Sequence, residues 1–230
     1  MYYKISNTAE KDTIEKWANA SFKYPNLYQP QQVINGLNEV SIPIITMENQ
    51  TEIALAIWGL LPEKYKEDWD IFQNATNTLN FHEESMNSEM WYTKALENRR
   101  GIIPVTGFFT HYLKNGDSYP YYISLKNGKP FFLASIYNQL EDGFFTCSLL
   151  VGQANSFIKK FQNMIDCMPL TVAPEEKEEW LNSNTPISKI KETLKSPLEN
   201  DFVATPIAKE LFNNNISYDS MLLPYEYPKS

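Results

Sequence analysis

The sequence predicts an α+β fold, in which helices decorate a largely antiparallel, barrel-like β-sheet. Aromatic residues form 14% of the 230 residues, with fourteen Tyr and thirteen Phe, and flat rings pack well on pleated strands. Short apolar runs bounded by turn residues recur along the chain. This pattern predicts a series of strands with helices between them. No stretch has the composition of a linker. We therefore expect a single domain over residues 1–212 and a polar tail over 213–230.

The N-terminal half is expected to hold short strands and two helices. Asn7 or Thr8 precedes an apolar 3.6-residue period and is expected to cap the first helix. Residues 21–43 are rich in Pro, Asn and Gln, which favours a loop. The expected elements are a strand at 2–5, a helix at 9–20, a hairpin of 40–47 and 51–58, a loop at 63–74 and a helix at 84–99.

Two Asn-Gly pairs dominate the C-terminal half. Asn115-Gly116 and Asn127-Gly128 flank an aromatic strand at 121–125, and Asn-Gly is the strongest short hairpin signal. Pro174 suits the first turn of a helix whose first residues are acidic. The other expected elements are a strand pair over 102–112, strands at 131–137, 144–151, 170–173 and 202–207, and helices at 155–164, 174–181 and 185–194.

Charge and cysteine use narrow the functional classes. The net charge is −8, which argues against a general nucleic-acid binder but leaves room for a local basic groove. Cys147, Cys167, His82 and His111 are scattered without ligand-like spacing, so we predict no metal site and no cofactor. The first ten residues do not resemble a signal peptide, so we expect a cytoplasmic protein with reduced thiols and no membrane partner.

An ordered series of short blocks carries a family resemblance. The blocks are Trp58-Gly-Leu-Leu-Pro62, Asn74-Ala75, Arg99-Arg-Gly-Ile-Ile-Pro104, Gly107-Phe-Phe109, Pro120-Tyr-Tyr-Ile123, Ala154-Asn155, Asp166-Cys-Met-Pro169, Pro174 and Trp180-Leu181. In order and spacing, over residues 1–207, the series resembles the SOS response-associated peptidase (SRAP) family, whose members bind abasic sites in single-stranded DNA. The resemblance implies an SRAP-like fold.

The resemblance also implies a chemistry. In the family, a cysteine at position 2 presents its α-amine and thiol together once the initiator Met is removed. Both groups add to the aldehyde of the ring-opened abasic site and close a thiazolidine, which leaves a stable DNA–protein cross-link. An Asn positions the cysteine, and a Glu and a His handle protons.

The chain departs from this pattern at the reactive positions. The family's Met-Cys-Gly-Arg start is Met1-Tyr-Tyr-Lys4, its Glu is Thr110, and its His is Ile165. Two arginines of the family motifs are replaced by Thr76 and Cys167, which predicts weaker phosphate binding. We therefore predict an inactive homologue, because the nucleophile and both proton-handling groups are missing together while the scaffold blocks remain.

Three residues are candidates for residual DNA binding. Lys4 keeps the charge of the family's Arg, Trp58 is an aromatic side chain suited to stacking on an unpaired base, and Asn74 occupies the position of the family's Asn. Trp58 is also explained as an aromatic that closes the sheet, and Asn74 as a loop cap. His111 follows Thr110, and strand alternation is expected to turn it to the opposite face. The Arg99-Arg100 pair is expected to be solvated.

Three functions remain open. The first is a pseudoenzyme that keeps at most weak single-stranded or abasic DNA binding, with a role near the DNA damage response. The alternative is a protein-interaction or scaffold module whose groove is filled by Tyr2, Tyr3 and Ile165. The third is an enzyme with altered residues. One residual reaction is also open, in which the Met1 α-amine forms a reversible Schiff base with the abasic aldehyde.

Overall fold

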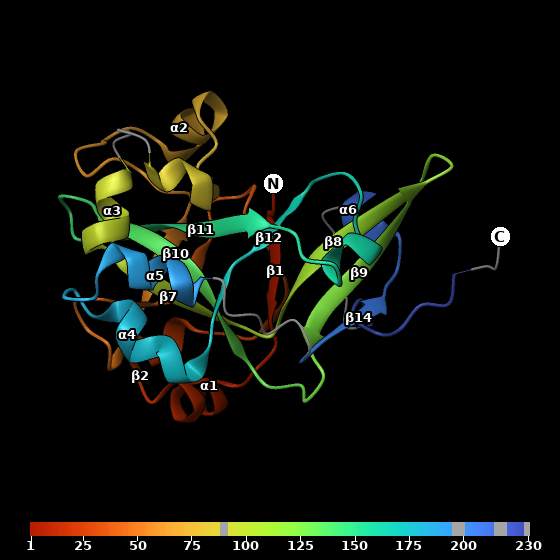
Figure 1. The fold of residues 1–230 in the computed structure, drawn as a ribbon, viewed down its shortest axis with the longest axis horizontal. Helices are drawn as coiled ribbons and strands as arrows, with labels where there is room; N and C mark the ends of the chain where they lie inside the picture. Colours follow the sequence, from red (N-terminus) through yellow and green to blue (C-terminus); the bar gives the residue numbers. More distant parts are fainter. Residues whose placement is uncertain (88–91, 195–200, 214–219, 228–230) are drawn as a thin grey trace.

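The predicted apolar strands pair into two sheets in the computed structural model, which describes residues 1–87, 92–194, 201–213 and 220–227. The fold is α+β (Figure 1). The larger sheet runs in the order β12 (Cys167–Pro169), β11 (Phe145–Gln153), β10 (Phe131–Gln139), β7 (Arg100–Val105), β4 (Ser41–Thr46), β5 (Glu52–Trp58) and β2 (Ser21–Phe22), with β13 (Thr171–Val172) and β6 (Asn80–His82) off this path. The smaller sheet runs β14 (Phe202–Pro206), β9 (Asp117–Leu125), β8 (Gly107–Lys114), β1 (Lys4–Asn7) and β3 (Gln31–Asn35).

The larger sheet closes on itself, as the barrel-like prediction requires. Antiparallel pairs join β5 to β4, β4 to β7, β7 to β10 and β10 to β11. A parallel pair between β11 and β5 returns the circuit to its start, with Phe145 opposite Ala56. All residues of β10 except the last are buried, because apolar side chains on both faces suit a strand that is covered on both sides.

Helices cover the outer face of this circuit. The helices are α1 (Lys11–Ala18), α3 (Thr93–Asn98), α4 (Lys177–Leu181) and α5 (Ile187–Thr193), and Figure 1 shows them on the side of the larger sheet. Their apolar residues pack with β10 in one buried cluster that includes Ile14, Trp180 and Ile190. The Arg100 side chain is 1% exposed within this layer, so the prediction of a solvated Arg99-Arg100 pair is wrong for Arg100.

The two Asn-Gly pairs have different outcomes. Asn115 (φ 54°) and Gly116 (φ 85°) both adopt positive φ, as a type I′ turn requires, and they join the β8–β9 hairpin as predicted. Gly128 also has a positive φ, of 67°. It does not close a hairpin, because β9 pairs with β8 and β14 whereas β10 pairs with strands of the larger sheet. The second turn therefore carries the chain from one sheet to the other.

Several local predictions are corrected by the structure. The first helix begins after Glu10, which has no side-chain cap bond, and the Asn7 side chain instead donates to the Pro104 carbonyl. The expected loop at 21–43 contains β3. The expected helix at 155–164 is a 3-10 turn, η3 (Ile158–Lys160), and the one at 84–99 is η2 (Glu83–Asn87) followed by α3, with residues 88–91 outside the described part.

The C-terminal segment packs on the smaller sheet. It contains α6 (Glu210–Asn213), and its Leu211 and Met221 side chains are fully buried with Phe109 of β8. Within the segment expected to be a polar tail, Met221 is buried and Leu222 packs beside it, whereas Leu223 and Tyr225 are exposed. No helix in the described ranges is long and apolar enough to cross a membrane.

Candidate functional site

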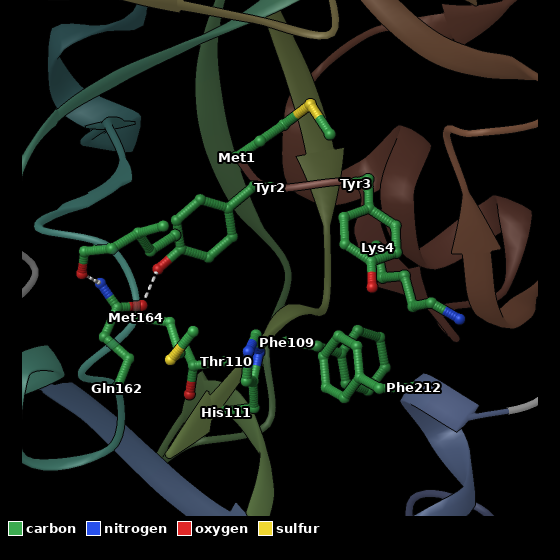
Figure 2. A pocket seen from close by; sticks show the side chains of 11 residues that line it. Met1, Tyr2, Tyr3, Lys4, Phe109, Thr110, His111, Gln162, Met164 and Phe212 are labelled. Carbon is green, nitrogen blue, oxygen red and sulfur yellow. Dashed lines mark hydrogen bonds between the residues drawn. The ribbon is translucent and has the colours of Figure 1, made fainter. Parts of the chain in front are cut away.

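The three positions at which the family's nucleophile and proton-handling residues are replaced come together at one small cavity. Tyr2, Thr110 and Ile165 line it, although they come from the N-terminus, β8 and the loop before β12. The cavity measures about 20 Å³, which is room for about one water molecule. Its lining is drawn in Figure 2 and consists of Met1, Tyr2, Tyr3, Lys4, Phe109, Thr110, His111, Gln162, Met164, Ile165 and Phe212.

The backbone of residue 2 is fixed by one asparagine. The Tyr2 N–H donates to Asn80 Oδ1 at 2.6 Å, and Asn80 Nδ2 donates to the Tyr2 carbonyl at 2.9 Å. Asn80 is held in turn because β6 pairs in parallel with β11, with Asn80 opposite Leu149. This two-point clamp contacts only backbone atoms of residue 2, so it holds the position independently of the side chain there.

The side chain of Tyr2 points into the site and fills it. It is 3% exposed, its ring meets Phe108 edge-on at 5.6 Å, and its hydroxyl hydrogen-bonds Gln162 Oε1 (Figure 2). Burial raises the pKa of this phenol well above its usual value. Tyr2 is therefore a neutral, packed side chain and not a reactive one.

Gln162 holds the loop that follows the single turn found at 158–160 in place of the predicted helix. Its Nε2 donates to the carbonyls of Ile165, at 3.0 Å, and Cys167, at 2.7 Å. Near the start of the segment, Asn155 Oδ1 accepts the Ile158 N–H at 2.8 Å, as an N-cap residue does. The resulting loop brings Gln162 and Ile165 to Tyr2.

The side of the cavity formed by β8 has no carboxylate. Thr110 is 2% exposed, and its Oγ1 has no hydrogen-bond partner among the described residues. His111 was expected on the opposite face, but it also lines the cavity, with its ring 4.8 Å from that of Phe212. Burial, and then the charge of the N-terminal amine, lower the pKa of His111. The imidazole is consequently neutral at pH 7.

Lys4 does not face solvent. It is 5% exposed, and Nζ donates to the Leu211 carbonyl at 2.8 Å. The ammonium also lies 5.7 Å from the ring centre of Tyr3 and 5.8 Å from that of Phe212. Lys4 is therefore buried under the C-terminal segment, which takes one of the three N–H donors of its ammonium.

Trp58 and Asn74 do not line the Tyr2 cavity. Trp58 is fully buried and donates from Nε1 to the Leu79 carbonyl at 3.0 Å, so neither face of its ring is free to stack on a base. Asn74 is exposed near the end of α2 (Trp69–Ala75). Asn80 makes the contact that the sequence analysis assigned to Asn74. The family block that begins Asn-Ala reads Asn-Ala-Arg-x-Glu, and Asn80 and Glu84 have its Asn-to-Glu spacing; this spacing is the signal that could have identified Asn80.

The thiols and carboxylates form no second reactive centre near this cavity. Cys147 is fully buried and burial raises its pKa, while Cys167 is partly buried and its pKa is also raised. Among the described residues, no three His, Cys, Asp or Glu side chains are grouped to hold a metal ion. A larger hollow of about 450 Å³ opens between β5 and the β10–β11 turn, and it shares no residue with the Tyr2 cavity.

A family model decides the relationship that these motifs suggested. The model described as SOS response associated peptidase (SRAP) matches residues 1–214. The chain belongs to the SRAP family. Among curated relatives, the abasic site processing protein YoaM of Bacillus subtilis is 23% identical over 224 residues, which is 95% of each chain. YoqW of the same organism, also named an abasic site processing protein, is 22% identical over 208 residues, covering 88% of this chain and 89% of YoqW.

Solved structures support the SRAP fold at low identity. A crystal structure from Bacteroides thetaiotaomicron superimposes with a TM-score of 0.84 at 23% identity, covering 97% of this chain and all of the other. One from Bordetella bronchiseptica gives a TM-score of 0.72 at 14% identity, covering 90% and 99%. Because both identities are low, these likenesses concern the fold.

Proposed function

We propose that this SRAP protein does not cross-link abasic DNA and binds single-stranded DNA weakly at most. One observation carries the proposal: the Tyr2 side chain occupies the place where a reactive residue 2 would meet its aldehyde. Asn80 fixes the Tyr2 backbone, Gln162 fixes its hydroxyl, and the cavity that remains holds about one water.

The chemistry of the lining agrees with this proposal. A thiazolidine needs an amine and a thiol on one residue, which add to the aldehyde carbon with loss of water. Tyr2 supplies no thiol, Thr110 supplies no carboxylic acid, and Ile165 has no titratable group. The Met1 α-amine can only form an imine, also with loss of water, and water reverses that step.

The electrostatics also favour weak binding. The chain has a net charge of −8, and the one cation that lines the cavity as a side chain, Lys4, is hydrogen-bonded within the protein. Affinity for DNA depends on cations that neutralise phosphates. We therefore expect little binding at physiological salt.

A cross-linking assay tests the proposal. The protein is incubated with an abasic single-stranded oligonucleotide, with and without borohydride, and resolved by denaturing electrophoresis. Wild type is expected to give no heat-stable adduct without reductant. The variant Tyr2→Cys/Thr110→Glu/Ile165→His, in which the small residue 2 permits removal of Met1, is expected to give one.

The control is Tyr24→Cys, which places a thiol on an exposed side chain far from an α-amine and should give no adduct. An adduct of the wild-type protein without reductant would refute the proposal. So would a folded triple variant with an exposed N-terminal cysteine that forms none, because the missing groups would then not explain the inactivity.

A second candidate function follows from the same filled site. If the groove is closed permanently, the protein is an interaction or scaffold module of the SRAP fold with no DNA ligand. The packing of Tyr2 against Phe108 and the contact of Tyr3 with Phe212, at 6.1 Å, favour this alternative. It predicts no binding of single-stranded DNA at any salt concentration, by wild type or by any variant that opens the site.

A further inference from the structure

We infer that the C-terminal segment acts as an intramolecular occupant of a surface for single-stranded nucleic acid. Residues 207–213 and 220–227 form this segment, the C-terminal strap. The inference builds on the proposed non-covalent function, and it concerns how access to that same site is controlled.

The strap first holds the cation of the site. Lys4 donates to the Leu211 carbonyl at 2.8 Å, and the Phe212 ring lies against both Tyr3, at 6.1 Å, and His111, at 4.8 Å. Phe212 also lines the cavity (Figure 2). The strap thus forms part of the cavity lining and occupies one donor of the cation that an anionic ligand would need.

The strap then covers the aromatic outer face of the smaller sheet. Ile207, Leu211 and Met221 are fully buried against Phe109, with Tyr122 packed beside them. The Phe109 and Tyr122 rings lie on paired positions of β8 and β9, 5.3 Å apart. Lifting the strap would expose these two rings next to Lys4.

The end of the strap reaches the other face of the sheet. Tyr227 lies 4.9 Å from Tyr119 and 6.2 Å from Tyr121 by ring centres. Its hydroxyl approaches the carbonyls of Pro120 and Ile207 at 2.8 and 2.6 Å. Tyr121 is paired with Thr110, and paired residues share a face, so this contact continues the Thr110 side of the site.

The covered surface has the composition of a single-strand binding surface. Successive bases stack on aromatic rings, and cations beside the rings track the phosphates. Phe109 and Tyr122 supply two rings on the face that the strap covers, and Lys4, which donates to Leu211 of the strap, supplies a cation. A duplex keeps its bases paired and stacked, so the rings favour a single strand.

Part of the strap lies beyond the family match, which ends at residue 214. Met221 and Tyr227 belong to that further part, and they contribute the fully buried thioether and the phenol that anchor it. These two side chains can therefore be changed without touching the matched SRAP region or the lining of the cavity.

The experiment measures binding of the full chain to an undamaged, fluorescent oligothymidylate by anisotropy across a salt series. Wild type is compared with Met221→Ser/Tyr227→Ala, and with Tyr24→Ala as an exposed-tyrosine control. Limited proteolysis read by mass spectrometry reports whether the strap is released. In the double variant we expect faster cleavage within the strap. We also expect its affinity for the oligonucleotide to rise about tenfold, which corresponds to one stacked base, and to depend more steeply on salt.

Adding Lys4→Gln to the double variant is expected to reduce the gain in affinity. It should also reduce the slope of log affinity against log salt concentration by about one unit. A released strap without tighter binding would overturn the inference, and so would a strap that stays protected. Because the oligonucleotide carries no aldehyde, this result is independent of the cross-linking assay. Failure of either proposal can thus be recognised separately.

Discussion

Arg100 and Lys4 are buried cations in two regions of the molecule, and they are held very differently. Arg100 lies under the helices of the larger sheet and donates to four backbone carbonyls at 2.7–2.8 Å, those of Trp180, Leu96, Glu97 and Asn182. Lys4 lies under the strap and donates to one carbonyl, that of Leu211. A guanidinium has five N–H donors and an ammonium has three.

The difference separates a structural cation from a releasable one. Arg100 joins the C-terminal ends of α3 and α4, where partial negative charge gathers, and uses most of its donors there. Lys4 has spare donors and a partner on a terminal segment. We therefore expect the hydrogen bonds of Arg100 to stay formed. We expect Lys4 to exchange the Leu211 carbonyl for a ligand.

The largest expected effect is that of Arg100→Met. Four buried carbonyls lose a charged donor, and each unsatisfied group costs about 1–3 kcal/mol, so we expect a loss of about 3–5 kcal/mol in the free energy of unfolding after partial relaxation. Urea denaturation measures it. The matched control is Arg99→Met, whose partner is the exposed Glu63, with an expected loss under about 1 kcal/mol. If both variants lost the same free energy of unfolding, Arg100 would contribute no more to stability than the partly solvated Arg99.

Trp58→Phe should act on the buried cluster that also contains Tyr2 and Phe108. The change leaves the Leu79 carbonyl without the indole donor and opens a small cavity, so we expect a loss of about 2 kcal/mol in stability. Binding of single-stranded DNA at 25 °C should not change, because the indole is fully buried. If a folded variant of unchanged stability lost affinity for single-stranded DNA, Trp58 would belong to the binding surface.

Lys4→Met should have a smaller effect on stability, about 1 kcal/mol, since one hydrogen bond is lost and the apolar chain still packs. Chemical denaturation gives this value. Proteolysis within the strap should accelerate in the same variant. A loss as large as that of Arg100→Met would mean that Lys4 is as firmly structural as Arg100.

The smallest expected effect is a pH dependence from His111. Its folded-state pKa lies below the ordinary value of 6.5, so the unfolded chain binds more protons between the two values. Stability should therefore fall as the pH drops through 6.5 towards the folded-state pKa, and this contribution should level off below it. Urea unfolding at several pH values should show a flatter profile for His111→Asn than for wild type or His82→Asn. An unchanged profile would contradict the assignment.

Much of the fold was predictable because apolar runs report burial. The hairpin of β4 and β5, the β8–β9 turn and the β10–β11 pair follow from local patterns. The turn at Asn127-Gly128 was misassigned because a local signal does not specify which sheet the next strand joins. Of the site, Tyr2, Thr110 and Ile165 were singled out by comparison with the family motifs, and the structure places all three in the lining of one cavity.

The rest of the site depends on contacts distant in sequence. Lys4 meets a carbonyl 207 positions away, and the Tyr2 hydroxyl meets Gln162, 160 positions away. No pattern near Lys4 indicates that it will be covered. Asn74 was chosen because Asn74-Ala75 matches two letters of the family block, and Asn80 was not considered; the pairing of β6 with β11 decides which Asn reaches residue 2.

The backbone clamp on residue 2 has an evolutionary consequence. Asn80 recognises only the N–H and C=O of that residue, so the second codon can change without dismantling the support. A different side chain at residue 2 would be held in the same position by the same two hydrogen bonds. Under the proposed loss of cross-linking, restoring the reaction would therefore require new side chains at residues 2, 110 and 165 but no new support for the backbone of residue 2.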